Sequence, residues 1–275
     1  MPEGDTLHRT ANRLRAALEG QPLRRLQLHH ATGGGRMPRP GERIEAVEAV
    51  GKHLLVRFER GTTLRTHLRM TGSWHLYRDG DRWRRPRPTA RAVIDVDGWT
   101  AVCFAAPVVE LTDDRAARTK ISHLGPDLTA ADITEDDIDR AVARMDELLE
   151  GGEEIGAVLL DQRVACGVGN VYKSEVLFLC GVDPFRAVRA VDVDTRRALL
   201  STASRLLRQN VATSGPRVTT ANGLAVYGRA RRPCRRCGSP IHAKRQGASA
   251  ASGGAAPWVQ GAHARTTYWC PTCQS

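Results

Sequence analysis

The chain has 275 residues, and its 41 Lys and Arg against 30 Asp and Glu leave a formal net charge of +11. Hydrophobic residues make up 41% and charged residues 26%, which is ordinary for a folded protein and excludes a disordered tail protein. No stretch approaches the ~20 apolar residues of a membrane span, and the start MPEGDTLHRT does not resemble a secretory signal. We therefore expect a cytoplasmic, basic protein of about two compact domains, with nucleic acid as its first candidate partner.

The predicted elements change in type along the chain. Residues 5–20 read as a helix that Asp5 or Thr6 can cap. From 23 to 110 short segments of strand character follow, separated by turn signals, namely RLQLH, RIEAVEAV, HLLVRFE, TTLRTHL and ARAVIDV. After Pro126 the pattern becomes helical, with segments predicted at 134–150 (capped by Thr134), 153–162, 171–180 and 192–212.

This order predicts an α+β chain of three parts. Residues 1–126 would form a helix with a β-sandwich or barrel, residues 127–222 a helical domain, and residues 223–275 a small module. The last part is too short to bury much of a hydrophobic core, and we therefore expect a metal to hold it together. Within it, the Gly/Ala/Ser-rich stretch 246–257 is predicted to be a flexible loop.

The strongest local signal is a pair of Cys-x-x-Cys motifs, Cys234 with Cys237 and Cys270 with Cys273. Two such pairs can place four thiolates tetrahedrally around one zinc ion, whose role would be structural because no position is left for water. The alternatives are redox pairs or unrelated free thiols. The odd total of seven cysteines argues against a disulfide framework, and Cys103, Cys166 and Cys180 are predicted to be core residues.

The N-terminus carries a second signal. Removal of Met1 would leave Pro2 with a secondary amine that can attack a sugar C1′ and form an iminium. The positive end of the following helix would disfavour the charged form of that amine, and Glu3 beside it could move protons at the sugar. The plain alternative is an ordinary chain start, because proline is common in this position and glutamate favours helix starts.

A third signal is the Gly167-Val168-Gly169-Asn170 turn before a helix. Such a turn exposes backbone N–H groups and an amide side chain at a positive helix end, which suits a phosphate. The alternative is purely architectural, with a glycine ending one element and Asn170 capping the next helix.

Together, the segments MPEG, GKHLL, LLDQRVACGVGNVYKSE, VYGRARRPCRRCG and ARTTYWCPTCQ stand in an order that resembles the formamidopyrimidine-DNA glycosylase / endonuclease VIII family of base-excision repair enzymes. The resemblance spans the chain. It implies an N-terminal helix and β-sandwich, a helix–two-turn–helix domain and a C-terminal zinc finger. It also implies a bifunctional DNA glycosylase/AP lyase that acts on damaged double-stranded DNA, as a monomer, and cuts the strand by β and δ elimination.

The resemblance also assigns roles to matching residues. Pro2 would be the nucleophile, Glu3 the general acid/base and Lys52 a catalytic lysine near the lesion phosphate. Asn170 and Arg265 would hold that phosphate, which offsets the cost of flipping the base out of the stack. Without the resemblance, Lys52 and Arg265 would be read as surface residues. The long insertion between the cysteine pairs departs from the family pattern and puts the placement of Arg265 in doubt.

Weaker assignments concern other residues. His67 resembles a phosphate contact, and Met70 resembles a wedge that fills the gap left by the flipped base, or else a core methionine. Lys173 and Glu175 would tune local charge. The basic segment with Arg82, Arg84, Arg85, Arg87 and Arg91 is interpreted as a solvated face.

Two branches of the family differ in substrate. The oxidised-purine branch typically has a lysine shortly before the LLDQ-like segment, whereas this chain has Ile155-Gly156-Ala157-Val158. With the GKHLL lysine, this favours the endonuclease VIII branch and oxidised pyrimidines, although Met70 favours the purine branch. Two other functions stay open: an inactive zinc-containing DNA-binding protein, and a zinc-ribbon translation or transcription factor, which would explain only the last fifty residues.

Overall fold

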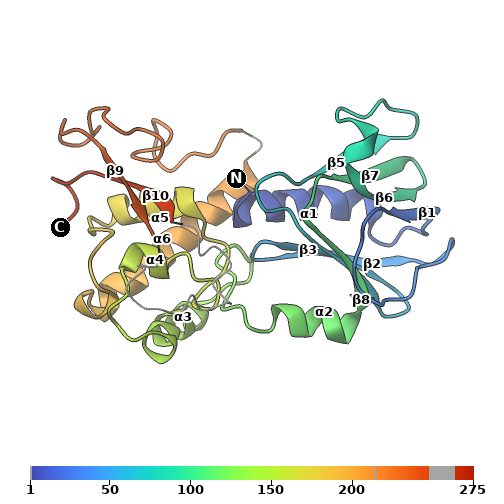
Figure 1. Cartoon of the computed structure of the whole chain (residues 1–275), viewed down its shortest axis with the longest axis horizontal. Coiled ribbons are helices and arrows are strands. Elements are labelled where there is room, and N and C mark those ends of the chain that lie inside the picture. Colours follow the sequence, from blue (N-terminus) through green and yellow to red (C-terminus); the bar gives the residue numbers. More distant parts are fainter. Residues whose placement is uncertain (1, 214, 248–263) are drawn as a thin grey trace. The chain divides into compact units, whose positions relative to one another are not determined.

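The computed structural model of the chain describes residues 2–213, 215–247 and 264–275. It comprises two compact units, Met1–His123 and Leu124–Ser275, coloured blue to green and green to red in Figure 1. The division falls close to the predicted end of the β-rich part, and the second unit holds both the helical segment and the cysteine-bearing C-terminal residues. In the described ranges, no helix is long and apolar enough to cross a membrane.

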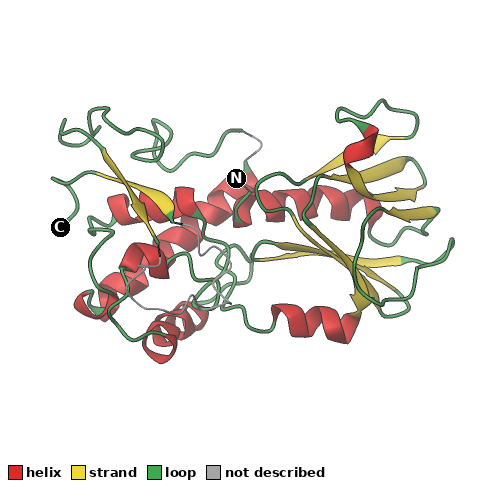
Figure 2. Cartoon of the chain, viewed as in Figure 1, coloured by secondary structure: helices red, strands yellow, loops and turns green. Residues whose placement is uncertain are grey.

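The first unit is a helix with a β-sandwich, which confirms the α+β class. Its two antiparallel sheets have the strand orders β1-β6-β7-β5 and β2-β3-β4-β8. Figure 2 draws the strands in yellow. The elements are α1 (Gly4–Leu18), β1 (Arg25–Leu28), β2 (Ile44–Val50), β3 (His53–Phe58), β4 (Thr62–His67), β5 (Ser73–Arg78), η1 (Arg87–Thr89), β6 (Ala90–Val96), β7 (Trp99–Phe104), β8 (Val108–Asp113) and α2 (Asp114–Ile121).

One hydrophobic core joins α1 to the inner faces of both sheets. Leu7, Leu14 and Leu18 of α1 are buried in it together with residues such as Phe58 and Ile94 of the two sheets. This burial follows from the helical spacing of the apolar residues in α1, because residues three or four apart share one face. The core therefore fixes α1, and with it the N-terminal residues, on the sandwich.

The ends of two helices differ from the sequence expectation. The prediction that Asp5 or Thr6 caps α1 is wrong, because Glu3 is the N-cap residue and caps through its backbone. Helix α2 was not predicted, since it is short and mostly polar. Its start is defined by the Asp113 carboxylate, which accepts a hydrogen bond of 2.7 Å from the Ala116 backbone N–H.

The second unit is a helical domain with a C-terminal hairpin. Its elements are α3 (Glu135–Leu148), α4 (Ile155–Val158), α5 (Asn170–Leu179), η2 (Val188–Ala190), α6 (Val193–Ala212), β9 (His242–Gln246) and β10 (Arg265–Trp269). The predicted cap is present at Thr134, which forms a capping box with Asp137. The segment predicted helical at 153–162 is helical only over Ile155–Val158.

The C-terminal residues pack against α5. Phe178 of α5 lies in a small cluster with Val226, Ile241 and Cys270, so the hairpin module shares a core with the helical domain. Its strands β9 and β10 pair antiparallel, with Arg265 opposite Gln246. The expectation that the loop begins at residue 246 is therefore wrong, because Gln246 ends β9 and is buried. Residues 248–257 of that predicted loop lie outside the described residues.

The three cysteines outside the paired motifs differ in burial. Cys103 and Cys166 are fully buried, as predicted, and burial raises the pKa of the Cys103 thiol far above its ordinary value. Cys180 is only half-buried and packs at the margin of the helical core, so the prediction of a core residue holds less well there.

Candidate active site and metal centre

The N-terminal residues lie at the start of α1, at its positive dipole end. Pro2 is half-buried and Glu3 is fully buried. The Glu3 carbonyl oxygen accepts hydrogen bonds from the backbone N–H groups of Thr6 at 3.0 Å and Leu7 at 3.1 Å, so its backbone forms the first helical turn. The Glu3 carboxylate does not cap the helix. A buried carboxylate is thus fixed one residue after the proline.

Lys52 and His67 come together in the second sheet of the same unit. Lys52 occupies the β2–β3 turn after Gly51, whose φ of +57° suits glycine. His53 follows it on β3 and pairs in register with His67 on β4, and the centroids of the two imidazole rings lie 4.8 Å apart. The positive charge of Lys52 acts on both imidazoles.

Both histidines are neutral in this environment. Burial, with the neighbouring imidazoles of His67 and His123 and the positive charges of Arg65 and Lys52 in addition, lowers the pKa of His53 to about 3. Burial and the charges of Lys52, Arg69 and Arg65 lower the pKa of His67 to about 4.

The tautomers follow from the donors around the rings. The guanidinium of Arg65 lies 3.1 Å from His53 Nδ1 and can only donate, so the His53 proton is on Nε2. The backbone N–H of Arg69 donates to His67 Nδ1 at 3.2 Å, which leaves the His67 Nε2–H as a hydrogen-bond donor. Arg65 is itself held by Glu110 at 2.7 Å.

Met70 lies in the β4–β5 turn, and 60% of its surface is exposed. This exposure excludes the alternative that it is a core residue. The turn is rigidly built, because the Thr71 hydroxyl donates to the Ala105 carbonyl oxygen at 2.9 Å. A side chain at Gly72 would collide with the backbone of Leu68. An exposed, unbranched apolar side chain on a fixed turn has the properties of a wedge.

In the second unit, Asn170 and Arg265 are neighbours although 95 positions separate them. Asn170 is the first residue of α5, and Gly169 is the N-cap, so the alternative of an Asn170 cap is wrong. The Asn170 side-chain amide donates to the Thr266 carbonyl oxygen at 2.8 Å. Arg265 precedes Thr266 and begins β10. The insertion therefore leaves Arg265 beside the positive end of α5, where an anion is favoured.

A buried polar chain holds β10 against α5. Lys173 is fully buried, and its ammonium donates to the Thr267 hydroxyl at 2.6 Å. That hydroxyl donates to the side-chain oxygen of Gln246 at 2.6 Å, and the Gln246 amide donates to Glu154 at 2.9 Å and to the Pro184 carbonyl oxygen at 2.7 Å. Lys173 therefore positions the strand that carries Arg265.

Glu175 is a second buried charge whose role the sequence analysis missed. Its carboxylate accepts hydrogen bonds from the backbone N–H groups of Ala225 (2.7 Å), Val226 (2.8 Å) and Tyr227 (2.7 Å) and from the Thr219 hydroxyl. It thus fixes the segment before the cysteine module. A signal was present, because Lys173 and Glu175 interrupt an otherwise apolar stretch, and charges inside such a stretch need buried partners.

The four paired cysteines converge. Their Sγ atoms all lie within 4.8 Å of one another, with 3.4 Å between Cys237 and Cys270 and 4.0 Å between Cys234 and Cys273. Four sulfur atoms at a Zn–S distance of about 2.3 Å in a tetrahedron are about 3.8 Å apart, so the cluster has the size that zinc requires. The alternative of unrelated thiols is excluded, and the donor set fits a structural site without an open position.

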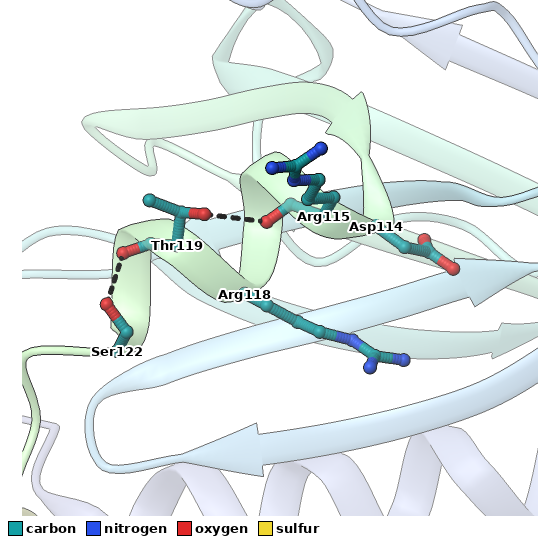
Figure 3. A pocket seen from close by; sticks show the side chains of 5 residues that line it. All are labelled: Asp114, Arg115, Arg118, Thr119 and Ser122. Carbon is teal, nitrogen blue, oxygen red and sulfur yellow. Dashed lines mark hydrogen bonds between the residues drawn. The ribbon is translucent and has the colours of Figure 1, made fainter.

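An open hollow on α2 contains none of the predicted site residues. It is lined by Asp114, Arg115, Arg118, Thr119 and Ser122, and Figure 3 shows two hydrogen bonds within it, from Thr119 to the Arg115 carbonyl oxygen and from Ser122 to the Thr119 carbonyl oxygen. Helix α2 packs on β4 and β8, so this hollow lies on the β2-β3-β4-β8 sheet. Strands β5 and β6, with the segment that joins them, belong to the other sheet.

Comparison with known proteins defines the class to which this arrangement belongs. Residues 1–119 match the formamidopyrimidine-DNA glycosylase N-terminal domain and residues 124–222 the formamidopyrimidine-DNA glycosylase H2TH domain. The chain is 38% identical to "Probable endonuclease 8 2" of Streptomyces coelicolor over 100% of this chain and 94% of the relative. It is 34% identical to "DNA-(apurinic or apyrimidinic site) lyase Nei2" of Mycolicibacterium smegmatis over 100% and 99%.

The chain therefore belongs to the formamidopyrimidine-DNA glycosylase / endonuclease VIII family. Solved structures agree on the fold. The Thermus thermophilus MutM (Fpg) protein superposes with a TM-score of 0.74 at 28% identity, covering 99% of this chain and 98% of that one. A DNA complex of Lactococcus lactis Fpg (MutM) superposes with a TM-score of 0.78 at 20% identity over the whole of both chains.

Proposed function

We propose that the chain is a base-excision repair enzyme, a bifunctional DNA glycosylase and DNA-(apurinic or apyrimidinic site) lyase. Relatives named endonuclease 8, AP lyase and formamidopyrimidine-DNA glycosylase match it from end to end. The observation that carries the mechanism is the fully buried Glu3 directly after Pro2 at the positive end of α1. A binding protein would need neither a free N-terminal amine nor a buried carboxylate beside it.

The first step is nucleophilic substitution at the sugar of the damaged nucleotide. After Met1 is removed, the lone pair of the Pro2 nitrogen attacks C1′, and the bond from C1′ to the base breaks with its electron pair leaving on the base. The Pro2 nitrogen loses its N–H proton after the attack, and the departing base takes up one proton, so that the step balances. Glu3 then donates a proton to the ring oxygen as the C1′–O4′ bond opens, which yields an iminium between C1′ and the Pro2 nitrogen. An iminium of a secondary amine has no N–H proton to lose, so it stays cationic.

Strand cleavage follows from the acidity that this cation creates. A proton acceptor in the site removes a proton from C2′. The electron pair of that C–H bond then expels the 3′ phosphate, which is β elimination. A second elimination expels the 5′ phosphate. We assign Lys52 to charge neutralisation and proton transfer at the lesion phosphate, with the neutral His67 donating from Nε2 beside it. Asn170 and Arg265 bind that phosphate, and Met70 fills the space left by the extruded base.

We infer that Cys234, Cys237, Cys270 and Cys273 bind one structural zinc ion. When bound, the ion would cross-link the hairpin module and hold β10 at the start of α5. The buried hydrogen bonds from Lys173 to Thr267 and from Thr267 to Gln246 also hold β10 in this position.

We infer oxidised pyrimidines as the substrates, with the oxidised-purine lesions formamidopyrimidine and 8-oxoguanine as the alternative. The segment that carries a lysine in the purine branch is α4 here, and Ile155, Gly156 and Val158 in it are buried and uncharged. A bacterial DNA repair enzyme has to be in the cytoplasm, where its DNA substrate is, so we expect that location. One copy of the site is enough to process one lesion at a time, so we expect a monomer.

The experiment is borohydride trapping of the Met-processed protein on duplexes that contain an abasic site, an oxidised pyrimidine or an oxidised purine. We expect a covalent protein–DNA adduct, with more adduct on the pyrimidine lesion than on the purine lesion. Pro2→Gly should strongly reduce it, whereas Pro40→Gly, at an exposed proline of the same unit, should not. Mass spectrometry of the N-terminus verifies that Met1 is absent. DNA binding without an adduct on any lesion would show a non-enzymatic binding protein instead.

A further inference from the structure

The segment between β5 and β6, residues 79–89, carries Arg82, Arg84, Arg85 and Arg87 within six positions, and all four are exposed. Nearby carboxylates are engaged elsewhere. Asp79 pairs with Arg24 at 3.0 Å, and Asp81 accepts a hydrogen bond from the Arg78 backbone N–H at 3.0 Å. Among the ion pairs of the described residues, none includes these four arginines. We call residues 79–89 the arginine segment.

The arginine segment is anchored to the sandwich by an aromatic core on the outer face of the β1-β6-β7-β5 sheet. Trp83 stacks on Tyr77 with ring centroids 6.4 Å apart and meets Phe104 edge-on at 5.7 Å. The backbone N–H of Arg84 donates to the Tyr77 hydroxyl at 3.0 Å. The backbone at Arg84 is thus fixed by buried groups. A solvated charged loop has no need of such an anchor, whereas a binding surface gains affinity from it because less entropy is lost on binding.

The anchored arginines adjoin the turn that bears Met70. The Arg85 guanidinium donates to the Thr71 carbonyl oxygen at 3.4 Å, one residue after Met70. The positive field extends further, since burial lowers the pKa of His75 and the charges of Arg85, Arg84 and Arg13 lower it more. Exposed cations and an exposed apolar wedge therefore form one continuous surface within the first unit.

We propose that Arg84 and Arg85 bind backbone phosphates of the DNA duplex beside the point where Met70 enters the base stack. This inference rests on the proposed function, because Met70 would enter the base stack only if the chain acts on damaged duplex DNA. Guanidinium groups suit phosphates in geometry and charge, and phosphate contacts are what set the position of a protein on a duplex. A wedge needs such support, because unstacking costs a few kcal/mol per step.

The test is the salt dependence of binding to an uncleavable duplex that contains a tetrahydrofuran abasic analogue. Each phosphate contact contributes about 0.9 to the slope of log K against log salt, so Arg84→Gln with Arg85→Gln should lower the slope by about 1.8. If counterion release is the whole effect, affinity at 0.1 M salt falls by up to about 60-fold.

The matched control is Arg115→Gln with Arg118→Gln on α2, which also removes two exposed arginines from the first unit (Figure 3). This variant should keep the wild-type slope. Thermal unfolding of both variants verifies folding. A second arm shortens the duplex from one side and then from the other. One of the two truncations should weaken DNA binding by the wild type and leave DNA binding by the Arg84/Arg85 variant unchanged.

The outcomes separate the two levels of inference. A wild type that traps DNA, with an unchanged slope in the Arg84/Arg85 variant, overturns this proposal and leaves the proposed function intact. An equal loss of slope in the α2 control overturns it as well, because the effect would then be one of net charge. A wild type that yields no adduct on any lesion contradicts the proposed function itself.

Discussion

Replacing Glu175 with glutamine tests how the C-terminal module is held to the helical domain. The wild-type carboxylate receives three backbone N–H groups and one hydroxyl, and all of these contacts are buried except that of Tyr227, which is partly buried. Glutamine has the same size but only one acceptor oxygen. Its best orientation keeps that oxygen on Val226 and Tyr227 and turns the NH₂ group toward Thr219, whose hydroxyl can rotate to accept. The Ala225 N–H is then left facing another donor.

The magnitude follows from these contacts. One orphaned buried N–H costs about 1–3 kcal/mol, and each hydrogen bond that changes from a charged to a neutral acceptor weakens by about 1 kcal/mol. For the N–H groups of Val226 and Tyr227 the second contribution is about 2 kcal/mol. We therefore expect the Glu175→Gln variant to lose about 3–5 kcal/mol of the free energy of unfolding. In a unit of this size, each kcal/mol corresponds to about 2–4 °C in Tm, so the shift is about 6–20 °C.

The assay is thermal unfolding by circular dichroism, with the transition of the second unit followed separately by calorimetry. The matched control is Glu153→Gln, at a half-exposed carboxylate that accepts from the backbone N–H groups of Glu150 and Gly151. Water can replace those bonds, so the control should stay within about 1 kcal/mol of the wild type. If the free energy of unfolding of Glu175→Gln also lies within about 1 kcal/mol of the wild type, the Glu175 carboxylate does not hold the C-terminal module to the helical domain.

Three further predictions concern the metal, the histidines and the phosphate contact. The protein purified without chelator should hold one zinc ion per chain by elemental analysis, and Cys237→Ser should bind it at least tenfold more weakly; a metal-free wild type would contradict the assignment. Because the folded-state pKa values of His53 (about 3) and His67 (about 4) lie below the ordinary 6.5, stability should be full above pH 6.5 and fall as pH is lowered toward 4. Denaturant midpoints measure this, and His53→Gln should flatten the dependence. Arg265→Ala should weaken binding to abasic-site duplexes and leave zinc content unchanged; loss of both would indicate misfolding.

Local capping and periodicity predicted much of the fold. The cap predicted at Thr134 is a short-range hydrogen bond, so the sequence contains both of its partners. The N-terminus of α1 was misjudged because side-chain caps are visible in a sequence, whereas a backbone cap such as that of Glu3 is not. The eight residues of α2 carry too few apolar positions to reveal a period.

The candidate site was predicted less evenly, for a related physical reason. The cysteine pairs are recognisable because both halves of each pair are close in sequence. The environment of Lys52 is not, because the pairing of β3 with β4 brings His67 beside it. Lys173 and Glu175 were interpreted as charges that tune the surroundings, yet both are fully buried. Partners that are distant in sequence, such as Thr267 for Lys173 and Ala225 for Glu175, explain why these charges are stable there.

The placement of Arg265 shows why an insertion need not displace the strand that follows it. The described residues at its two ends are paired in one hairpin, with Gln246 opposite Arg265. Gln246 is fixed by Glu154 and Pro184, and Thr267 by Lys173, so both strands are tied to the helical domain by buried hydrogen bonds. The entropic cost of a longer loop grows only with the logarithm of its length. A register secured on both strands can therefore hold Arg265 at the start of α5 whatever length of chain joins them.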